Sequence, residues 1–225
     1  MATQLDLQEQ EQLDELKAFW KQYGNLVTWT VVVALAAYAG WSGWNYWQRD
    51  QGLKAGAMYD ALDQAAQAGN AERVGQIFSD LRQRYGGTAF AEQGGLLAAK
   101  VQFDKNQVDA AKASLGWVAE NAKETQYRDI AHLRLAGLLA DAGKYDAALA
   151  QVDAVKDGDF AALAADRRGD VLFREGRKDQ ARAAYQAAWK AMDPKLDYRH
   201  LIDAKLTALG AAPDAAASAA SGASR

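Results

Sequence analysis

The sequence predicts an all-α protein in which a single transmembrane helix near the N-terminus precedes a solenoid of helical hairpins. Three observations predict this class. The 225 residues contain only two prolines, Pro194 and Pro213, so long helices can run without interruption. Residues 22–48 include no side chain that is charged at neutral pH. After Tyr59, apolar residues recur at helical spacing between glycine or asparagine turns, with no alternating pattern that would indicate strands.

Residues 1–24 form an acidic tail that is predicted to contain a short helix. Five of the first 21 residues are acidic and two are lysines. Leu13, Leu16 and Trp20 fall on one face at helical spacing. Two interpretations stay open: a helix that lies at a membrane interface, or a solvated lead-in to the next segment.

Residues 25–48 are predicted to cross a lipid bilayer, because the uncharged run exceeds the roughly 20 helical residues that a bilayer core requires. Aromatic residues gather near both ends, as they do at membrane interfaces: Trp29, Trp41, Trp44, Tyr46 and Trp47. A cleaved signal peptide, cut near Ala37 and Ala39, is the alternative. The acidic tail and the apolar residues beyond that site favour a retained anchor.

The charges beside the span do not decide its direction, since Lys17 and Lys21 precede it and Arg49 and Lys54 follow it. Small residues four apart line one helix face and predict lateral association with another membrane helix: Ala36, Ala39, Gly40 and Gly43. The simpler interpretation is that glycine and alanine are common in such helices.

Residues 49–209 contain a repeated pattern. Turns at Gly69, Asn106, Gly143 and Gly176 are 37, 37 and 33 residues apart, and a period of about 34 with two helices is typical of tetratricopeptide repeats. Small residues recur where the two helices of a repeat would meet: Ala99, Ala136 and Gly169 before the turns, and Ala111, Ala148 and Ala181 after them. The first unit has Leu62 and Val74 there instead, which indicates a cap or a divergent repeat.

The first helix of each unit is predicted to line a concave protein-binding face. By the repeat register this face comprises Gln93, Leu96, Lys100, Phe103, Ile130, Leu133, Gly137, Asp166, Asp170 and Phe173. For any single member, ordinary core packing or a solvated surface is the simpler interpretation, so only the face as a whole is a binding candidate.

No pattern indicates an enzyme, a cofactor, a metal site or a small-molecule substrate. The chain lacks cysteine, and His132 and His200 have no neighbour at metal-ligand spacing. The net charge of -3 arises in the first 21 residues, so a basic nucleic-acid-binding surface is not indicated. Residues 210–225, rich in alanine and serine, are predicted to be disordered.

Three stretches carry a resemblance to a known family: "EQLDELKAFWKQYGN", "GWNYWQ", and a long repeat block that includes "ADRRGD" and "GRKDQARAAY". Over residues 9–209 the chain resembles the YfgM-type ancillary subunit of the SecYEG translocon. The resemblance implies a single-pass protein of the bacterial inner membrane, with a cytoplasmic N-terminus and a periplasmic repeat domain. It further implies three partners: the translocon, a membrane-anchored periplasmic chaperone and exported client proteins. It supplies no catalytic residues.

We therefore expect a membrane-anchored protein-binding module that links exported chains at the Sec translocon to periplasmic chaperones. The alternative is a structural scaffold or assembly factor of an inner-membrane complex, which associates mainly through its transmembrane helix.

Overall fold

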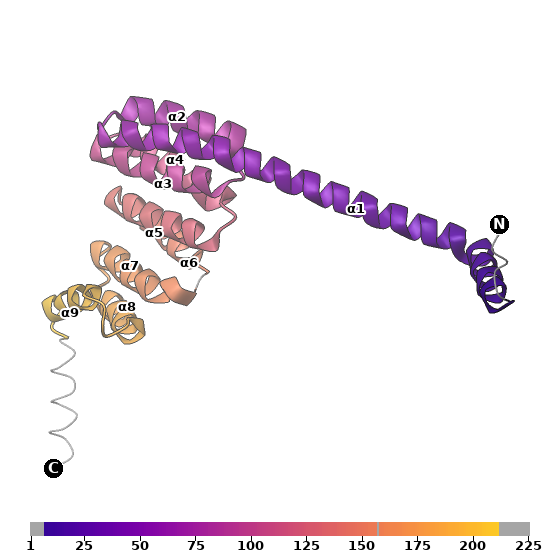
Figure 1. Cartoon of the computed structure of the whole chain (residues 1–225). Helices are drawn as coiled ribbons and strands as arrows, with labels where there is room; N and C mark the ends of the chain where they lie inside the picture. The colour runs from indigo at the N-terminus through magenta and orange to yellow at the C-terminus, as the bar shows by residue number, and fades with distance from the viewer. Residues whose placement is uncertain (1–6, 157, 212–225) are drawn as a thin grey trace, which may run out of the picture. The chain divides into compact units, whose positions relative to one another are not determined.

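The computed structural model describes residues 7–156 and 158–211, with side chains from Glu11 onward. Within these residues all regular elements are helical, which confirms the predicted all-α class (Figure 1). Their order is α1 (Leu7–Gln67), α2 (Ala71–Tyr85), α3 (Ala89–Asp104), α4 (Val108–Asn121), α5 (Thr125–Asp141), α6 (Tyr145–Asp153), the short 3-10 helix η1 (Gly158–Phe160), α7 (Ala161–Arg174), α8 (Lys178–Ala191) and α9 (Tyr198–Ala208). Most of the tail predicted to be disordered, residues 212–225, lies outside the described residues.

The chain divides into two units, residues 1–51 and 52–225, and the division falls inside α1. In the first unit α1 carries exposed apolar side chains on all sides, among them Val31, Val32 and Val33 at 50%, 47% and 62% exposure. The hydroxyls of Thr28 and Thr30 donate to helix carbonyl oxygens four residues earlier, at 2.7 and 2.8 Å. Part of α1 is thus long and apolar enough to cross a membrane, and these two hydroxyls are satisfied inside the helix.

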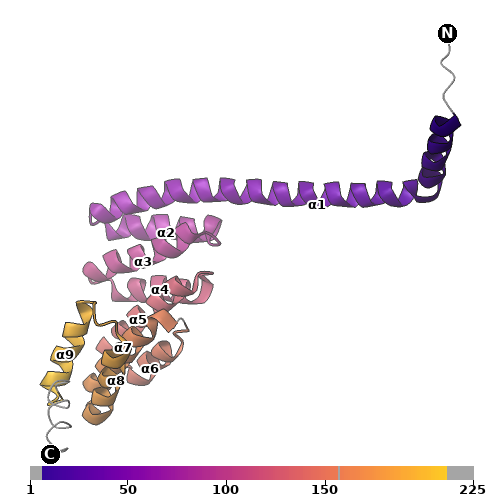
Figure 2. The same cartoon turned by 60° about the horizontal axis from the view of Figure 1, so that its bottom comes forward.

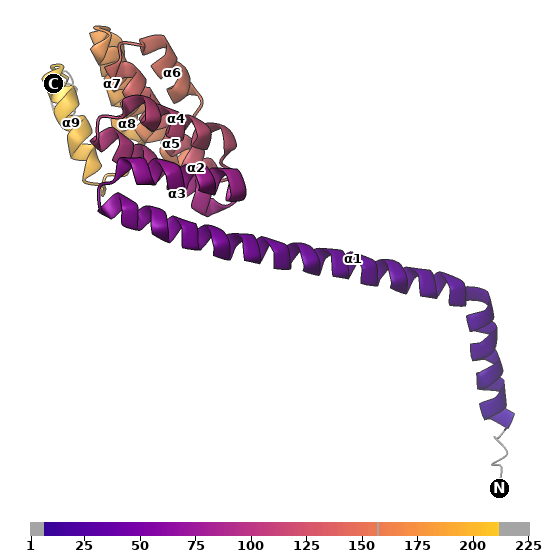
Figure 3. The same cartoon turned by 90° about the horizontal axis from the view of Figure 1, so that it is seen from above.

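The second unit is a stack of helical hairpins (Figure 2). The last part of α1, residues 52–67, pairs with α2, and the next hairpins are α3 with α4, α5 with α6 and α7 with α8. The first helices of successive hairpins also touch, α3 against α5 and α5 against α7. Helix α9 packs on α8 at the C-terminal end of the stack (Figure 3).

The four turns predicted from the sequence share one backbone geometry. Gly69, Asn106, Gly143 and Gly176 all have positive φ, between 58° and 87°. In each turn the N–H of the following residue donates to the carbonyl oxygen five residues earlier, in the last turn of the helix, as Lys144 does to Leu139 at 2.9 Å. This is the Schellman motif, which ends a helix and satisfies its last carbonyls. The pattern of glycine or asparagine therefore marks where each first helix stops.

The repeated small residues lie where helices meet most closely. All six are buried: Ala99, Ala111, Ala136, Ala148, Gly169 and Ala181. At Gly169 a Cβ would lie 2.4 Å from the Tyr185 ring, so a side chain there would collide with α8. In the first hairpin the larger Leu62 is accommodated because Gly94 faces it from α3, with the glycine's Cβ position 3.5 Å from a Leu62 methyl group.

A matched pair of glycine substitutions tests the turn geometry. Gly143→Ala forces an L-residue into the left-handed region and should lower the free energy of unfolding by about 1 kcal/mol. Gly116→Ala, in the interior of α4 with open space beside it, should raise it by roughly 0.5–1 kcal/mol through helix propensity. Urea unfolding of the full-length chain in detergent, followed by circular dichroism, measures both. Changes of the same sign would contradict the assignment.

Candidate protein-binding groove

An open groove with a volume of about 320 Å³ is lined by residues of helices α3, α4, α5 and α7. Its lining comprises Ala99, Lys100, Phe103, Leu115, Arg134, Gly137, Leu138, Asp141 and Arg167. Lys100, Phe103 and Gly137 belong to the face predicted from the sequence, and Ala99 was predicted as a packing residue. Phe103 is 47% exposed, so part of its ring is available to a ligand.

The apolar members predicted for α5 and the N-terminal half of α3 do not line this groove. Leu96 and Leu133 are buried in the core, and Ile130 is half-buried against the cluster around Leu115. Gln93 is half-buried and donates its amide N–H to the Tyr127 hydroxyl at 2.7 Å. These residues hold the hairpins together and do not face an open surface.

Asp166 and Asp170 take part in an internal network. Asp166 is only 2% exposed, and its carboxylate accepts hydrogen bonds from Lys205 Nζ and the Tyr198 hydroxyl, both at 2.8 Å. Asp170 accepts from Lys205 Nζ at 2.7 Å and the Tyr185 hydroxyl at 2.8 Å. The sequence placed both carboxylates on an open face. They lie beneath α9 instead, and Asp166 is not available to a partner.

Buried carboxylates recur along the stack at a spacing of 37 residues. Glu92, Asp129 and Asp166 lie on α3, α5 and α7, each with at most 2% exposure. Glu92 accepts the backbone N–H of Lys123 at 2.9 Å, and Asp129 accepts that of Lys156 at 3.1 Å. Both acceptors therefore hold the loop that leads to the next hairpin. Sequence reasoning missed this set. The turn register would have found only the first two acids, which each stand 14 residues before their turn, because the third stands 10 residues before its own.

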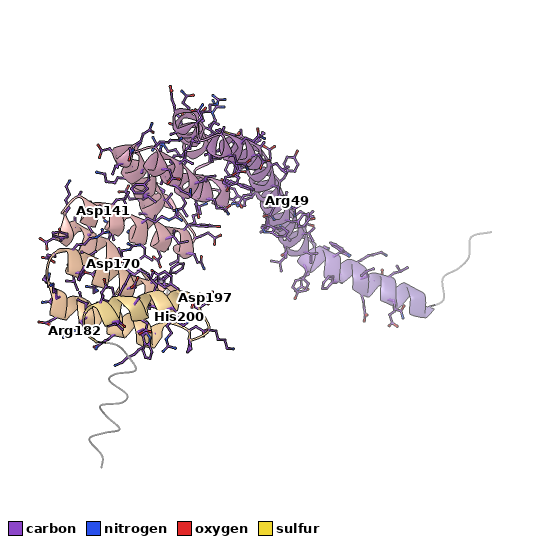
Figure 4. All side chains as sticks on the ribbon, turned by 90° about the vertical axis from the view of Figure 1, so that its left-hand side faces the viewer. Arg49, Asp141, Asp170, Arg182, Asp197 and His200 are labelled. Atoms are coloured by element: carbon purple, nitrogen blue, oxygen red, sulfur yellow. The ribbon has the colours of Figure 1, made fainter. Side chains whose placement is uncertain are left out.

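The charges of the groove are unevenly compensated. Lys100 pairs with Asp104 at 2.8 Å, and Asp141 pairs with Arg174 across to α7. Asp141 and Asp170 lie on successive first helices of the stack (Figure 4). Arg167 reaches Asp170 only at 3.6 Å, beyond hydrogen-bond distance. The lining thus carries three cations and one acid that is already paired.

Arg134 is the least compensated of these cations. Its Nη1 donates to the carbonyl oxygen of Leu96 at 3.2 Å. Within residues 11–156 and 158–211, no carboxylate forms an ion pair with it. Burial by its surroundings lowers the pKa of the Arg134 guanidinium from the ordinary 12.5. Arg134, Gly137 and Asp141 are three and four apart on α5, a spacing that could have revealed their shared face from sequence.

The predicted association face lies on α1, in the other unit. Ala36, Ala39, Gly40 and Gly43 are all exposed, and apart from the neighbouring backbone of α1 itself no described atom lies within 4 Å of the Cβ positions at Gly40 and Gly43. Among the described residues, no group of three or more histidine or acidic side chains is placed to hold a metal ion. His132 Nδ1 lies 2.8 Å from Gln151 Oε1, in a contact between α5 and α6.

Hairpins that stack through small residues, with an open groove on their first helices, define a tetratricopeptide repeat-like protein. The sequence profile described as "Tetratricopeptide repeat-like domain" accordingly matches residues 17–211. Curated relatives are named "Ancillary SecYEG translocon subunit". The chain is 31% identical to the one from Neisseria gonorrhoeae over 90% of its own length and 98% of the relative's. It is 28% identical to the Escherichia coli protein, over 81% of this chain and 88% of the relative. The chain belongs to the family of YfgM-type ancillary SecYEG translocon subunits, as its resemblance indicated.

Two tyrosines that donate to the carboxylates of α7, Tyr185 on α8 and Tyr198 at the start of α9, predict a loss of stability at alkaline pH. Burial, and then the facing carboxylates, raise the pKa of Tyr185 and of Tyr198 above the ordinary 10.0. Because the folded-state pKa is higher than the unfolded one, this stabilisation is complete below pH 10.0 and decreases as the pH rises above it. Tyr198→Phe should therefore make the free energy of unfolding fall less steeply above pH 10.

Urea unfolding of the full-length chain at several pH values between 8 and about 11.5 measures that slope. Tyr145→Phe is the matched control, because Tyr145 lies on α6, away from Asp166 and Asp170. Equal alkaline slopes for the wild type and Tyr198→Phe would contradict the assignment.

Proposed function

We propose that the chain is a membrane-anchored protein-binding module that accompanies the Sec translocon and links exported chains to periplasmic chaperones. The observation that carries the proposal is the groove on α3, α5 and α7. It combines the exposed Phe103 ring, the apolar side chains of Leu115 and Leu138, and cationic groups at its edge. Concave sites of this mixed character bind ligands, and buried aromatic contacts supply much of the binding energy at interfaces.

The names of the relatives support the choice of partner. Proteins of Neisseria gonorrhoeae and Escherichia coli that match nearly the whole chain are named as subunits ancillary to the SecYEG translocon. A tether also suits a groove of modest affinity, because confinement near a membrane partner raises the effective concentration of each for the other. A newly exported segment that leaves the translocon would thus meet the groove repeatedly.

For the topology we propose a single pass through the bacterial inner membrane, with residues 1–24 in the cytoplasm and residues 49–209 in the periplasm. Alkaline phosphatase fused after Leu209 should be active, since it folds only outside the cytoplasm. Green fluorescent protein fused at the same point should stay dark after Sec export, whereas a fusion before Met1 should fluoresce. A fluorescent C-terminal fusion would overturn the periplasmic location.

Photocrosslinking from the groove tests protein binding directly. A benzoylphenylalanine that replaces Phe103 should capture exported proteins in intact cells, because this ring lies on the open lining. The same group at Ala113, exposed on α4 outside the lining, is the control. Capture from Phe103 should exceed capture from Ala113 by about tenfold, an advantage of about 1.4 kcal/mol. Equal capture from both sites would overturn groove binding.

A scaffold that associates mainly through α1 is the second candidate, and the open space beside Gly40 and Gly43 favours it. Replacement of both glycines by leucine separates the two functions. If the protein is a scaffold, the translocon should no longer co-purify with this variant. If the groove itself binds clients, capture from Phe103 should persist in the same variant. Unchanged co-purification would exclude the scaffold.

A further inference from the structure

We propose that the groove recognises an acidic side chain, aspartate or glutamate, flanked by apolar residues in an extended segment of a partner protein. Arg134 and Arg167 bind the carboxylate, and Phe103 and Leu138 contact the apolar neighbours. This inference rests on the proposed function, because it names the chemistry of the segment that the same groove binds.

Arg134 supplies the first argument. A guanidinium has five N–H donors in a planar fork, and one nitrogen of Arg134 is engaged by the Leu96 carbonyl oxygen at 3.2 Å. This bond directs the side chain across the gap between α5 and α3 without neutralising its charge. The Arg134 side chain is exposed and its guanidinium has no carboxylate partner among the described residues, so a bound carboxylate can accept charge-assisted hydrogen bonds from it.

Arg167 supplies the second argument. Its Nη1 lies 3.4 Å from the Cβ position of Gly137, so the absence of a side chain at Gly137 leaves room for the guanidinium above α5. Its acidic neighbour Asp170 is already hydrogen-bonded to Lys205 and Tyr185 and lies 3.6 Å from Arg167. Arg167 thus keeps N–H groups that can donate to a second carboxylate. These groups reach Gly137 from α7, whereas Arg134 makes its hydrogen bond toward α3.

The remaining lining determines what surrounds the carboxylate. Lys100 and Asp141 are paired with Asp104 and Arg174, and Arg167 lies 3.6 Å from Asp170, so Arg134 is the cation of the described lining without an ion pair. The apolar surface is chiefly the Phe103 ring, because the other apolar lining residues, Ala99, Leu115 and Leu138, are at most 8% exposed. The lining is drawn from successive hairpins and is open to solvent, so a chain can continue in both directions past the bound residue. This arrangement favours an internal acidic side chain over a C-terminal carboxylate.

The probe is a pool of nonapeptides with acetylated and amidated ends. Their five central positions vary among alanine, leucine, phenylalanine, serine, glutamine, glutamate and lysine. Full-length protein in detergent is immobilised, and the retained peptides are sequenced. Glutamate beside leucine or phenylalanine should be enriched about tenfold over glutamine at the same position, since a charge-assisted hydrogen bond replaces a neutral one.

Charge reversal is the sharpest variant. Arg134→Glu should shift the enrichment from glutamate to lysine, whereas Arg84→Glu, at an exposed position of α2 outside the groove, should leave it unchanged. If the circular dichroism of Arg134→Glu shows a loss of helix, Arg134→Gln and Arg167→Gln take its place. Each should then abolish most of the glutamate enrichment without reversing it.

The inference would be overturned by an absence of glutamate enrichment or by enrichment that survives every groove variant. Retention that requires a free C-terminal carboxylate, in a second, non-amidated pool, would also overturn it. Crosslinking from Phe103 distinguishes this failure from failure of the proposed function. Capture from Phe103 without acidic enrichment means that the groove binds proteins but selects them by another chemistry. Enrichment that falls as salt is raised from 50 to 500 mM would support the ionic contact; enrichment that is insensitive to salt would contradict it.

Discussion

The arrangement of the hairpins depends on one buried carboxylate in each of the helices α3, α5 and α7. A carboxylate without hydrogen-bond partners is strongly disfavoured in a protein interior, so each acid stabilises the fold only where the next segment brings a donor to it. Glu92 and Asp129 accept N–H groups from the loops at Lys123 and Lys156, which fixes where α5 and α7 begin. The same helices α3, α5 and α7 contribute most of the groove lining.

The third acid shows how the stack ends. No further hairpin follows α8 within the described residues, and Asp166 accepts hydrogen bonds from side chains of α9 in place of a loop N–H. Lys205 also neutralises Asp170, so a single amine compensates two carboxylates and locks α9 over α7. The network explains why Asp166 is buried and Asp170 half-buried, because α9 covers both carboxylates. Phe173, the last residue of the predicted face, stays 47% exposed but does not line the groove.

The hairpins could be predicted from the sequence because their turns depend on local backbone conformation. Contacts between distant segments produce no comparable local sequence pattern. A residue with positive φ must be glycine or asparagine in most cases, so Gly69, Asn106, Gly143 and Gly176 mark the turns without knowledge of their neighbours. The burial of Asp166 depends on Lys205, 39 residues away on a helix outside the repeat pattern. Arg134 and Arg167 each stand nine residues before the turn of their own repeat, so the repeat register could have revealed this pair, although not the contacts that they make.

The continuity of α1 bears on how the repeat domain is held at a membrane. Between residues 25 and 67 the sequence contains no proline, and Gly52 and Gly56 lie inside the helix without ending it. Gly56 is instead a contact site, where the Phe90 ring lies 3.4 Å from its Cβ position. The same helix therefore supplies the apolar segment of the first unit and the first buried layer of the second, with Ala55 and Leu62 fully buried. The first hairpin is built from the continuation of this apolar helix and packs on only one neighbouring hairpin. Its larger core residues, and the glycines that face them, suit such a terminal layer.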